Sequence, residues 1–245
     1  MATVRKVALV IPAWNEVDAI GAVLDEIPSS SVDDVLIVVG SPTDPTASVA
    51  RPRGARVIVQ TQPGYGAACW TGALTALNEG TDMIAFLDGD YSDPPAELQR
   101  VLEPVLNGRA DLTLGRRDLR AFPSALPLHA RLGNQLVLLI LRVLLGSRFT
   151  DLPSFKAVRS DVLREMDMRE MTYGWTVEML VKASRAGLHV EEVPVVYRPR
   201  LGGRSKVAGS MRASIVAAVK LLGCAVAYAT WRPPQTGRWS VASGH

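Results

Sequence analysis

Two aspartates separated by one glycine, Asp88 and Asp90, follow the apolar run 83–87. Side chains two positions apart on an extended strand point to the same side, so both carboxylates are expected to face one space. Close carboxylates repel each other, and a hard divalent cation with oxygen ligands relieves that repulsion and can bridge to a diphosphate. The pattern therefore predicts a Mg²⁺ or Mn²⁺ site, with a solvated Asp-Gly turn as the alternative interpretation.

A glycine-rich basic stretch near the C-terminus is the second candidate for chemistry. It contains Arg200, Arg204 and Lys206 among glycines at positions 202, 203 and 209. Glycine frees the backbone, so such a stretch can close its cations over an anion such as a diphosphate. A basic surface loop without a ligand is the alternative interpretation.

The elements that would position these residues alternate between strand and helix in the first half of the chain. Predicted strands, rich in β-branched residues, lie at 7–11, 35–39, 56–59 and 83–87. Predicted amphipathic helices lie at 16–27, 67–79 and 94–106, with Asn15 placed to cap the first of them. This order predicts a right-handed βαβ sheet whose ligand site lies at the carboxyl ends of the strands.

The alternation breaks after about residue 115. The sequence then predicts an arginine-rich loop, an apolar helix near 134–145, a turn at 151–154, a helix at 175–186, a strand at 190–197 and a last helix at 213–231. The segment 232–245 is predicted to be a disordered tail. We expect residues 1–231 to form a single domain.

The composition excludes several classes of protein. Lys and Arg total 27 against 24 Asp and Glu, a net charge of +3, and no basic run of the kind that follows nucleic acid is present. Cys69 and Cys224 belong to no C-x-x-C pair, so they are interpreted as buried thiols in a reducing cytoplasm. The N-terminus shows no export signal.

Two strongly apolar segments, 136–145 and 213–231, raise the question of a membrane. The first is shorter than the ~20 residues that cross a bilayer as a helix. The second carries Lys220 in its middle, which costs roughly 2.5 to 3.5 kcal/mol on insertion scales. Both are therefore expected to be core helices or membrane-surface helices.

Taken together, the motifs resemble those of family 2 glycosyltransferases with the GT-A fold, and among them the dolichyl- and polyprenyl-phosphate sugar synthases. The resemblance covers about residues 7–210. The segments that carry it are Pro12-Ala13-Trp14-Asn15-Glu16, Gly64-Tyr65-Gly66, Asp88-Gly89-Asp90 with Pro94-Pro95, Gly115-Arg116-Arg117, Arg131 with Gly133-Asn134, Thr150-Asp151, Tyr173-Gly174-Trp175-Thr176-Val177-Glu178 and Arg204-Ser205-Lys206.

The resemblance implies an α/β GT-A fold, Rossmann-like, with a mostly parallel central sheet and helices on both faces. It assigns 1–115 to the nucleotide-sugar half and 116–231 to the acceptor half. The implied metal ligands are Asp88, Asp90 and Ser92, and Ser92 stands where relatives often carry Gln. The other implied donor-binding residues are Pro12, Trp14, Glu16, Arg200, Arg204, Ser205 and Lys206.

The same resemblance implies an inverting hexosyl transfer from a nucleoside-diphosphate sugar to a polyprenyl phosphate, catalysed on the cytoplasmic face of a membrane by a peripheral protein. Arg117 and Arg131 match positions that grip the acceptor phosphate. A phosphate monoester arrives largely ionised, whereas a hydroxyl acceptor needs a base, for which Glu178 is the candidate. Transfer to a hydroxyl and a non-catalytic binding protein of the same fold are the alternatives.

One departure from the family pattern concerns the nucleobase. Relatives follow their second strand with an acidic pair, the first of which contacts the base, but this chain has Val39 and Gly40 there. Base recognition must therefore come from backbone groups or another side chain. A dinucleotide-dependent oxidoreductase is disfavoured, because the first strand leads into residues 12–16 rather than a G-x-G-x-x-G turn.

Overall fold

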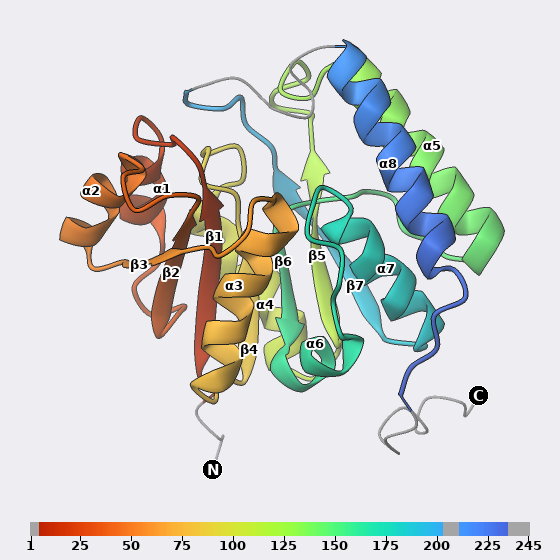
Figure 1. Ribbon diagram of the computed structural model, residues 1–245, viewed down its shortest axis with the longest axis horizontal. Helices are drawn as coiled ribbons and strands as arrows, with labels where there is room; N and C mark the ends of the chain where they lie inside the picture. Colours follow the sequence, from red (N-terminus) through yellow and green to blue (C-terminus); the bar gives the residue numbers. More distant parts are fainter. Residues whose placement is uncertain (1–4, 203–210, 235–245) are drawn as a thin grey trace.

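A computed structural model describes residues 5–202 and 211–234. Its centre is a seven-stranded sheet in the order β3-β2-β1-β4-β6-β5-β7 (Figure 1). The strands are β1 (Val7–Ala13), β2 (Asp34–Val39), β3 (Arg56–Val59), β4 (Met83–Phe86), β5 (Leu112–Asp118), β6 (Lys156–Arg159) and β7 (Val190–Val196). All neighbours pair in parallel except β6, which is antiparallel to both β4 and β5. The sheet thus runs through both halves of the chain.

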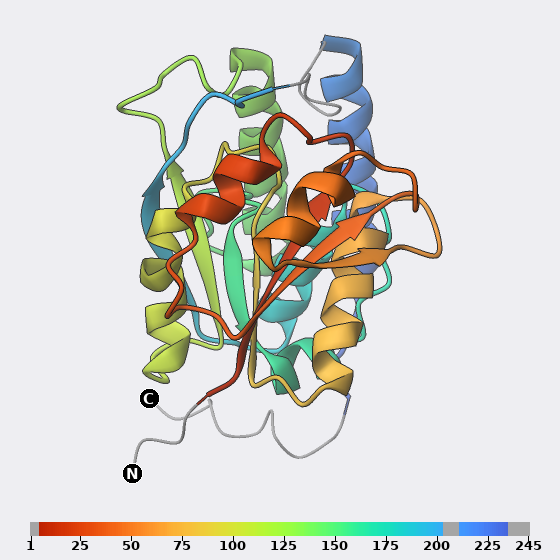
Figure 2. The same cartoon turned by 90° about the vertical axis from the view of Figure 1, so that its left-hand side faces the viewer.

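Helices cover both faces of the sheet (Figures 1 and 2). They are α1 (Ile20–Glu26), α2 (Thr46–Ala50), α3 (Tyr65–Asn78), α4 (Leu98–Leu106), α5 (Leu128–Leu145), α6 (Ser160–Met166), α7 (Trp175–Arg185) and α8 (Met211–Tyr228), with 3-10 turns at Arg51–Arg53 and Pro95–Glu97. One core joins the sheet to α1, α2 and α4. The other joins it to α3, α5, α6, α7 and α8. The predicted α/β architecture is confirmed.

The close packing of α3 on the sheet depends on Gly72. A Cβ at this position would lie 2.4 Å from Val10 Cγ1 and 3.1 Å from Val38 Cγ2. Since real side chains do not approach so closely, only glycine lets α3 rest on β1 and β2 at this depth. The amino end of α3 is thereby held at the carboxyl edge of the sheet.

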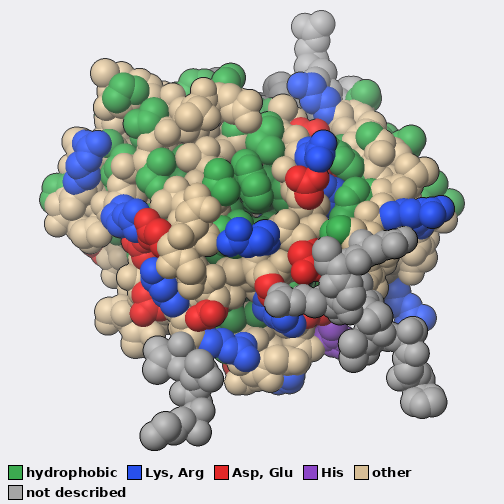
Figure 3. All heavy atoms as spheres, turned by 60° about the horizontal axis from the view of Figure 1, so that its bottom comes forward, with side chains coloured by type: hydrophobic (Ala, Val, Ile, Leu, Met, Phe, Trp, Pro, Cys, Tyr) green, Lys and Arg blue, Asp and Glu red, His purple; other side chains and the backbone are tan. Residues whose placement is uncertain are grey.

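The edge of the sheet at which the parallel strands begin is held by ion pairs of both signs. Arg56 at the start of β3 pairs with Asp34 and Glu79, and Arg159 at the end of β6 pairs with Asp111. In Figure 3, where this edge comes forward, acidic and basic side chains lie interspersed among apolar ones. Such exposed pairs contribute about 0–1 kcal/mol each, so the two cores, rather than this edge, stabilise the fold.

Several element predictions were wrong in detail. The first helix begins at Ile20 instead of residue 16, and its N-cap is Ala19. Asn15 makes no cap there, because its backbone lies in the left-handed region with φ of 54°. The arginine-rich segment predicted as a loop continues β5 as far as Asp118, where that strand pairs with Val196 of β7.

The sequence reading also missed β6 and α6 and placed the start of α5 about six residues too late. β6 contains two basic residues in four, so it lacks the apolar run that identifies a buried strand. Nevertheless Lys156 is fully buried. α5 begins at Leu128 because Pro127 and the following turn precede it, and it runs beside α8 (Figure 1).

Candidate active site

Asp88 lies just beyond β4, where the parallel part of the sheet ends. The Tyr65 hydroxyl donates a hydrogen bond to Asp88 Oδ1 over 3.1 Å. Burial, and then the charge of Asp90, raises the pKa of Asp88 to about 6. Gly89 separates the two aspartates and approaches β1 so closely that a Cβ would lie 3.2 Å from Ala13 Cβ. The carboxylates therefore share one crowded, electrostatically repulsive space, as predicted from their spacing.

Tyr65 is aimed at Asp88 by the Gly64-Tyr65-Gly66 turn. Gly64 has φ of +136°, and a Cβ on it would lie 2.1 Å from the carbonyl oxygen of Met171. The Gly66 N–H donates to the carbonyl of Thr172 at 3.0 Å. The two glycines are thus required for a close backbone contact, and this contact fixes the start of α3 and the tyrosine on it.

Asp90 is nearly buried and is held by three donors. The Ser92 N–H and hydroxyl donate to Oδ1 over 2.9 and 2.5 Å. Arg200 Nη1 forms an ion pair with Oδ2 at 2.7 Å, and Arg200 Nη2 donates to Glu16 at 2.9 Å. The structure therefore brings together four residues expected from the sequence, Asp90, Ser92, Glu16 and Arg200, although Ser92 acts here by orienting Asp90.

A buried layer below these carboxylates was not found from the sequence. Asp93 is fully buried, accepts a hydrogen bond from Ser154 at 2.7 Å, and leaves Oδ1 without a partner. Burial, and then the charge of Asp88, raises the pKa of Asp93 to about 8. Lys156 is also buried and donates to Thr176 at 2.6 Å, and burial lowers its pKa to about 8. The third Asp of the run at 88–93 was the only sequence signal for this layer.

The donor set fits a hard divalent cation that also binds a ligand. Within the described ranges 5–202 and 211–234, no group of three or more His, Cys, Asp or Glu side chains could hold a metal by itself. Mg²⁺ and similar ions are commonly held by one or two carboxylates together with substrate phosphates and water. Asp88 and Asp90 supply that number, and the Arg200 guanidinium on Asp90 demonstrates that the place attracts positive charge.

The loop after β1 carries Trp14 and Glu16. Asp44 fixes this loop by accepting hydrogen bonds from the N–H of Asn15 at 3.1 Å and of Thr46 at 2.9 Å. The Thr46 hydroxyl in turn accepts the Glu16 N–H at 3.0 Å. Pro12 is half-buried in β1, whereas Trp14 exposes 60% of its surface. The loop is therefore rigid at its base and presents an aromatic face at the carboxyl edge of the sheet.

The two arginines expected to hold a phosphate have different surroundings. Arg117, at the end of β5, donates through Nε and Nη2 to Asp151 over 2.8 and 2.5 Å, and only 10% of its side chain is exposed. Arg131 lies in the first turns of α5, where Nε donates to the carbonyl of Leu126 at 2.8 Å. The structural pairing considered for Arg117 is therefore present, and the guanidinium of Arg131 is half-buried.

Glu178 lies apart from the carboxylates. Its side chain is fully buried, accepts the N–H groups of Arg169 and Glu170 at 2.7 to 3.1 Å, and pairs with Lys182 Nζ at 2.6 Å. The ammonium group lies 5.0 Å from the ring centre of Tyr228. These contacts join α7 to the preceding loop and to α8, so the surroundings of Glu178 are those of a structural ion pair rather than of a base that meets a substrate.

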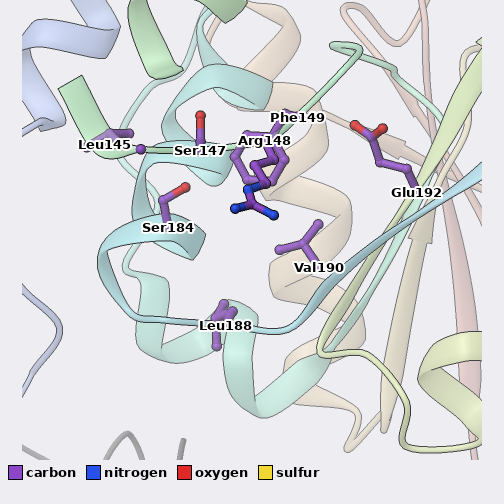
Figure 4. Close-up of a pocket in the computed structure, with 9 residues that line it drawn as sticks. Leu145, Ser147, Arg148, Phe149, Ser184, Leu188, Val190 and Glu192 are labelled. Carbon is purple, nitrogen blue, oxygen red and sulfur yellow. The ribbon is translucent and has the colours of Figure 1, made fainter. Parts of the chain in front are cut away.

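Arg204, Ser205 and Lys206 lie outside the described residues, as do 235–245 of the expected tail. A separate pocket of about 350 Å³ opens between the end of α5, α7 and β7, with the guanidinium of Arg148 near its middle (Figure 4). None of the residues that line it belongs to the carboxylate site. Its lining residues are Leu145, Gly146, Ser147, Arg148, Phe149, Ser184, Leu188, Val190 and Glu192.

Two characterised groups of proteins resemble the chain in sequence and in structure. An uncharacterised glycosyltransferase of Mycobacterium tuberculosis is 36% identical over 86% of this chain and 94% of its own length. Undecaprenyl-phosphate mannosyltransferase of Micrococcus luteus is 30% identical over 90% of this chain and 95% of its own.

The fold is shared with glucosyl-3-phosphoglycerate synthase of M. tuberculosis, solved with Mn²⁺, UDP-glucose and phosphoglyceric acid. That structure superposes with a TM-score of 0.75 at 21% identity, covering 95% of this chain and 82% of the synthase. The mixed seven-stranded sheet with helices on both faces is therefore the GT-A fold. Residues 8–167 match the sequence profile of Glycosyl transferase family 2, and the chain belongs to that family.

Proposed function

We propose that the protein transfers a hexosyl group from a nucleoside-diphosphate sugar to a polyprenyl phosphate, with inversion at the anomeric carbon. The observation that carries this proposal is the character of α5. The helix bears Arg131 in its first turns, and its outward side chains include the exposed Leu128, Leu132 and Val143. A cation beside a solvent-facing apolar surface suits a ligand that has a phosphate head and a hydrocarbon chain.

The donor is proposed to bind at the carboxyl edge of β1 and β4. Asp88 and Asp90 would hold Mg²⁺ or Mn²⁺, with Ser92 orienting Asp90 or adding an oxygen, and a bound cation would neutralise charge on the leaving diphosphate. Arg200 would add positive charge at the same place, together with Arg204, Ser205 and Lys206. Pro12, Trp14 and Glu16 would border the nucleoside.

The acceptor side needs cations rather than a base. A phosphate monoester is largely ionised at neutral pH, since its second pKa is about 6. Arg131, and Arg117 from its ion pair with Asp151, would place such a phosphate for attack. The burial of Glu178 in its pair with Lys182 supports this choice over a hydroxyl acceptor, for which that residue would have to meet the substrate.

A membrane surface is proposed as the place of reaction. Among the described helices, α5 is long and apolar enough to cross a bilayer by length and composition, with mean hydropathy 1.4. It packs along one side on α7 and α8, where Val137 and Leu141 are buried. We therefore place α5 on the cytoplasmic face of the membrane as a peripheral contact, helped by the exposed Val219 and Val226 of α8.

The test is a transfer assay with purified protein, Mn²⁺ and a panel of radiolabelled nucleoside-diphosphate sugars. Each donor is offered with a short polyprenyl phosphate, with the matching polyprenol, and with 3-phosphoglycerate. The proposal requires product from the polyprenyl phosphate only. Product from the polyprenol would indicate a hydroxyl acceptor, and product from 3-phosphoglycerate would exclude a requirement for the lipid.

A further inference from the structure

Three neighbouring strands end together at the carboxyl edge of the sheet. The registers of β1 with β2 and of β2 with β3 put one residue of each strand on the same rung, namely Ala13, Val39 and Val59. The residues that follow this rung are Trp14, Gly40 and Gln60. They therefore leave the sheet side by side, next to the loop that carries Glu16.

The middle one of the three has no side chain, and the neighbouring amide borders the space this leaves. A Cβ on Gly40 would lie 3.7 Å from Gln60 Nε2, which is ordinary van der Waals contact. The Gln60 N–H donates to the carbonyl of Val39 at 2.9 Å, so the backbone of this glutamine is fixed to β2. The side chain of Val39 itself is fully buried in the core. Of positions 39, 40 and 60, only Gln60 presents a polar side chain at this edge.

The surroundings suit a flat ring with polar edges. Trp14 exposes 60% of its surface and can stack against a base, and such stacking is tolerant of base identity. A primary amide both donates and accepts hydrogen bonds, so it can pair with a ring N–H and an adjacent carbonyl at the same time. Uracil and guanine both carry that combination.

We propose that Gln60 reads the edge of the donor nucleobase in the space that Gly40 leaves open. This inference rests on the proposed function, because it assumes a nucleoside-diphosphate donor beside Asp88 and Asp90. It makes Gln60 a specificity-determining residue of the donor site. A carboxylate at Gly40 would accept hydrogen bonds only, whereas the amide at Gln60 also supplies a donor.

Two variants at Gln60 separate its hydrogen bonds from its bulk. Gln60→Ala removes both bonds, and Gln60→Glu keeps the size but replaces the donor with a negative charge. A third variant, Gly40→Asp, places a carboxylate where it can engage Gln60 Nε2. Gln60 is half-buried and lies after β3, so these variants are expected to fold, which circular dichroism and thermal melting would check.

The measurement is calorimetric titration of each variant with UDP, GDP, CDP and ADP in the presence of Mn²⁺, with Mn²⁺ and pyrophosphate as the control ligand. For the tightest of the four nucleotides, Gln60→Ala should weaken binding about 3- to 10-fold, the effect of one or two ordinary hydrogen bonds. The preference among the bases should narrow in Gln60→Ala and change order in Gln60→Glu. Gly40→Asp should also lower the preference, and pyrophosphate affinity should stay unchanged in every variant.

The outcomes distinguish the two levels of the argument. If the wild type binds none of the four nucleotides with Mn²⁺, the proposed function and this inference both fail. If the wild type discriminates among them and Gln60→Ala and Gln60→Glu do so equally, only the role of Gln60 is overturned. Parallel loss of pyrophosphate and nucleotide affinity would also overturn it, because the effect would then lie at the cation site.

Discussion

Arg200 and Asp90, 110 positions apart in sequence, form an ion pair of 2.7 Å. The segment around Arg200 is fastened to the aspartate loop by backbone bonds as well, because the Leu201 N–H donates to the carbonyl of Asp90 at 3.1 Å and the Arg198 N–H donates to that of Ser92 at 2.8 Å. A divalent cation that binds Asp90 must therefore share this carboxylate with Arg200 or displace it.

Replacing Arg200 should separate cation binding from nucleotide binding. We expect Arg200→Met to raise the affinity for Mn²⁺ alone by about tenfold, since the competing bond is of the charged class. The same change should weaken UDP or GDP binding, because a cation beside the diphosphate is lost. Mn²⁺ electron paramagnetic resonance would measure the first effect, with Arg198→Met, whose guanidinium pairs with Glu26, as the matched control. Unchanged Mn²⁺ affinity in Arg200→Met would contradict the competition.

Asp90 is the residue on which cation-dependent donor binding should depend. Asp90→Asn is expected to abolish Mn²⁺-dependent binding of the nucleotide while the chain still folds, because removing one anion relieves its repulsion with Asp88. Equilibrium binding with and without Mn²⁺, together with a thermal melt, would check both parts. Turnover like that of the wild type in this variant would exclude the site.

The raised pKa of Asp88 predicts how cation binding and stability depend on pH. Its pKa is about 6, raised by burial and by Asp90, so Mn²⁺ affinity should fall about tenfold per pH unit below that value. The folded pKa exceeds the unfolded value of ~3.9, so ionised Asp88 destabilises the fold above about pH 6, and the cost fades as pH falls toward 4. Asp88→Asn should therefore raise the metal-free melting temperature at pH 7.5, but not at pH 4. A gain of equal size at both pH values would refute this assignment.

Arg131 and Glu178 should differ in kind. Arg131→Ala is expected to lower kcat/KM for a polyprenyl phosphate at least tenfold, with donor affinity nearly unchanged. Glu178→Gln breaks a buried ion pair and should destabilise the fold by about 3–5 kcal/mol, with a smaller effect on turnover by the folded fraction. Urea unfolding and steady-state kinetics on both variants would decide. An essential Glu178 and a dispensable Arg131 would instead indicate a hydroxyl acceptor.

The outer side of α5 should bind membranes. Val143→Glu and Leu132→Glu place charges on side chains that are 77% and 62% exposed, so the fold should survive. Each should reduce sedimentation with anionic vesicles by tenfold or more, because burying one such side chain contributes about 1.5–3 kcal/mol. Leu74→Glu, at an exposed leucine of α3, is the matched control. Equal vesicle binding by all of these proteins would rule out α5 as the contact.

The sequence by itself determined the parts that depend on local patterns. Buried strands of four to seven residues and their amphipathic helices repeat along the first half of the chain, and period alone identifies them. The spacing of Asp88 and Asp90 determined that both would lie at one strand end, since adjacent turns of an extended chain leave few other arrangements. The ordered motifs determined the family.

Only the tertiary structure decided what each charged side chain faces. Nothing local distinguishes Arg117, which binds Asp151, from Arg131, which caps the turn before α5, and β6 was invisible because buried Lys156 breaks its apolar pattern. Glu178 falls within a family motif, yet its charge is neutralised by Lys182 inside the core. Charges act through space at distances that sequence separation does not encode, so the pairing of Arg200 with Asp90 existed only once β7 had been laid beside β5 and the chain had returned to the site.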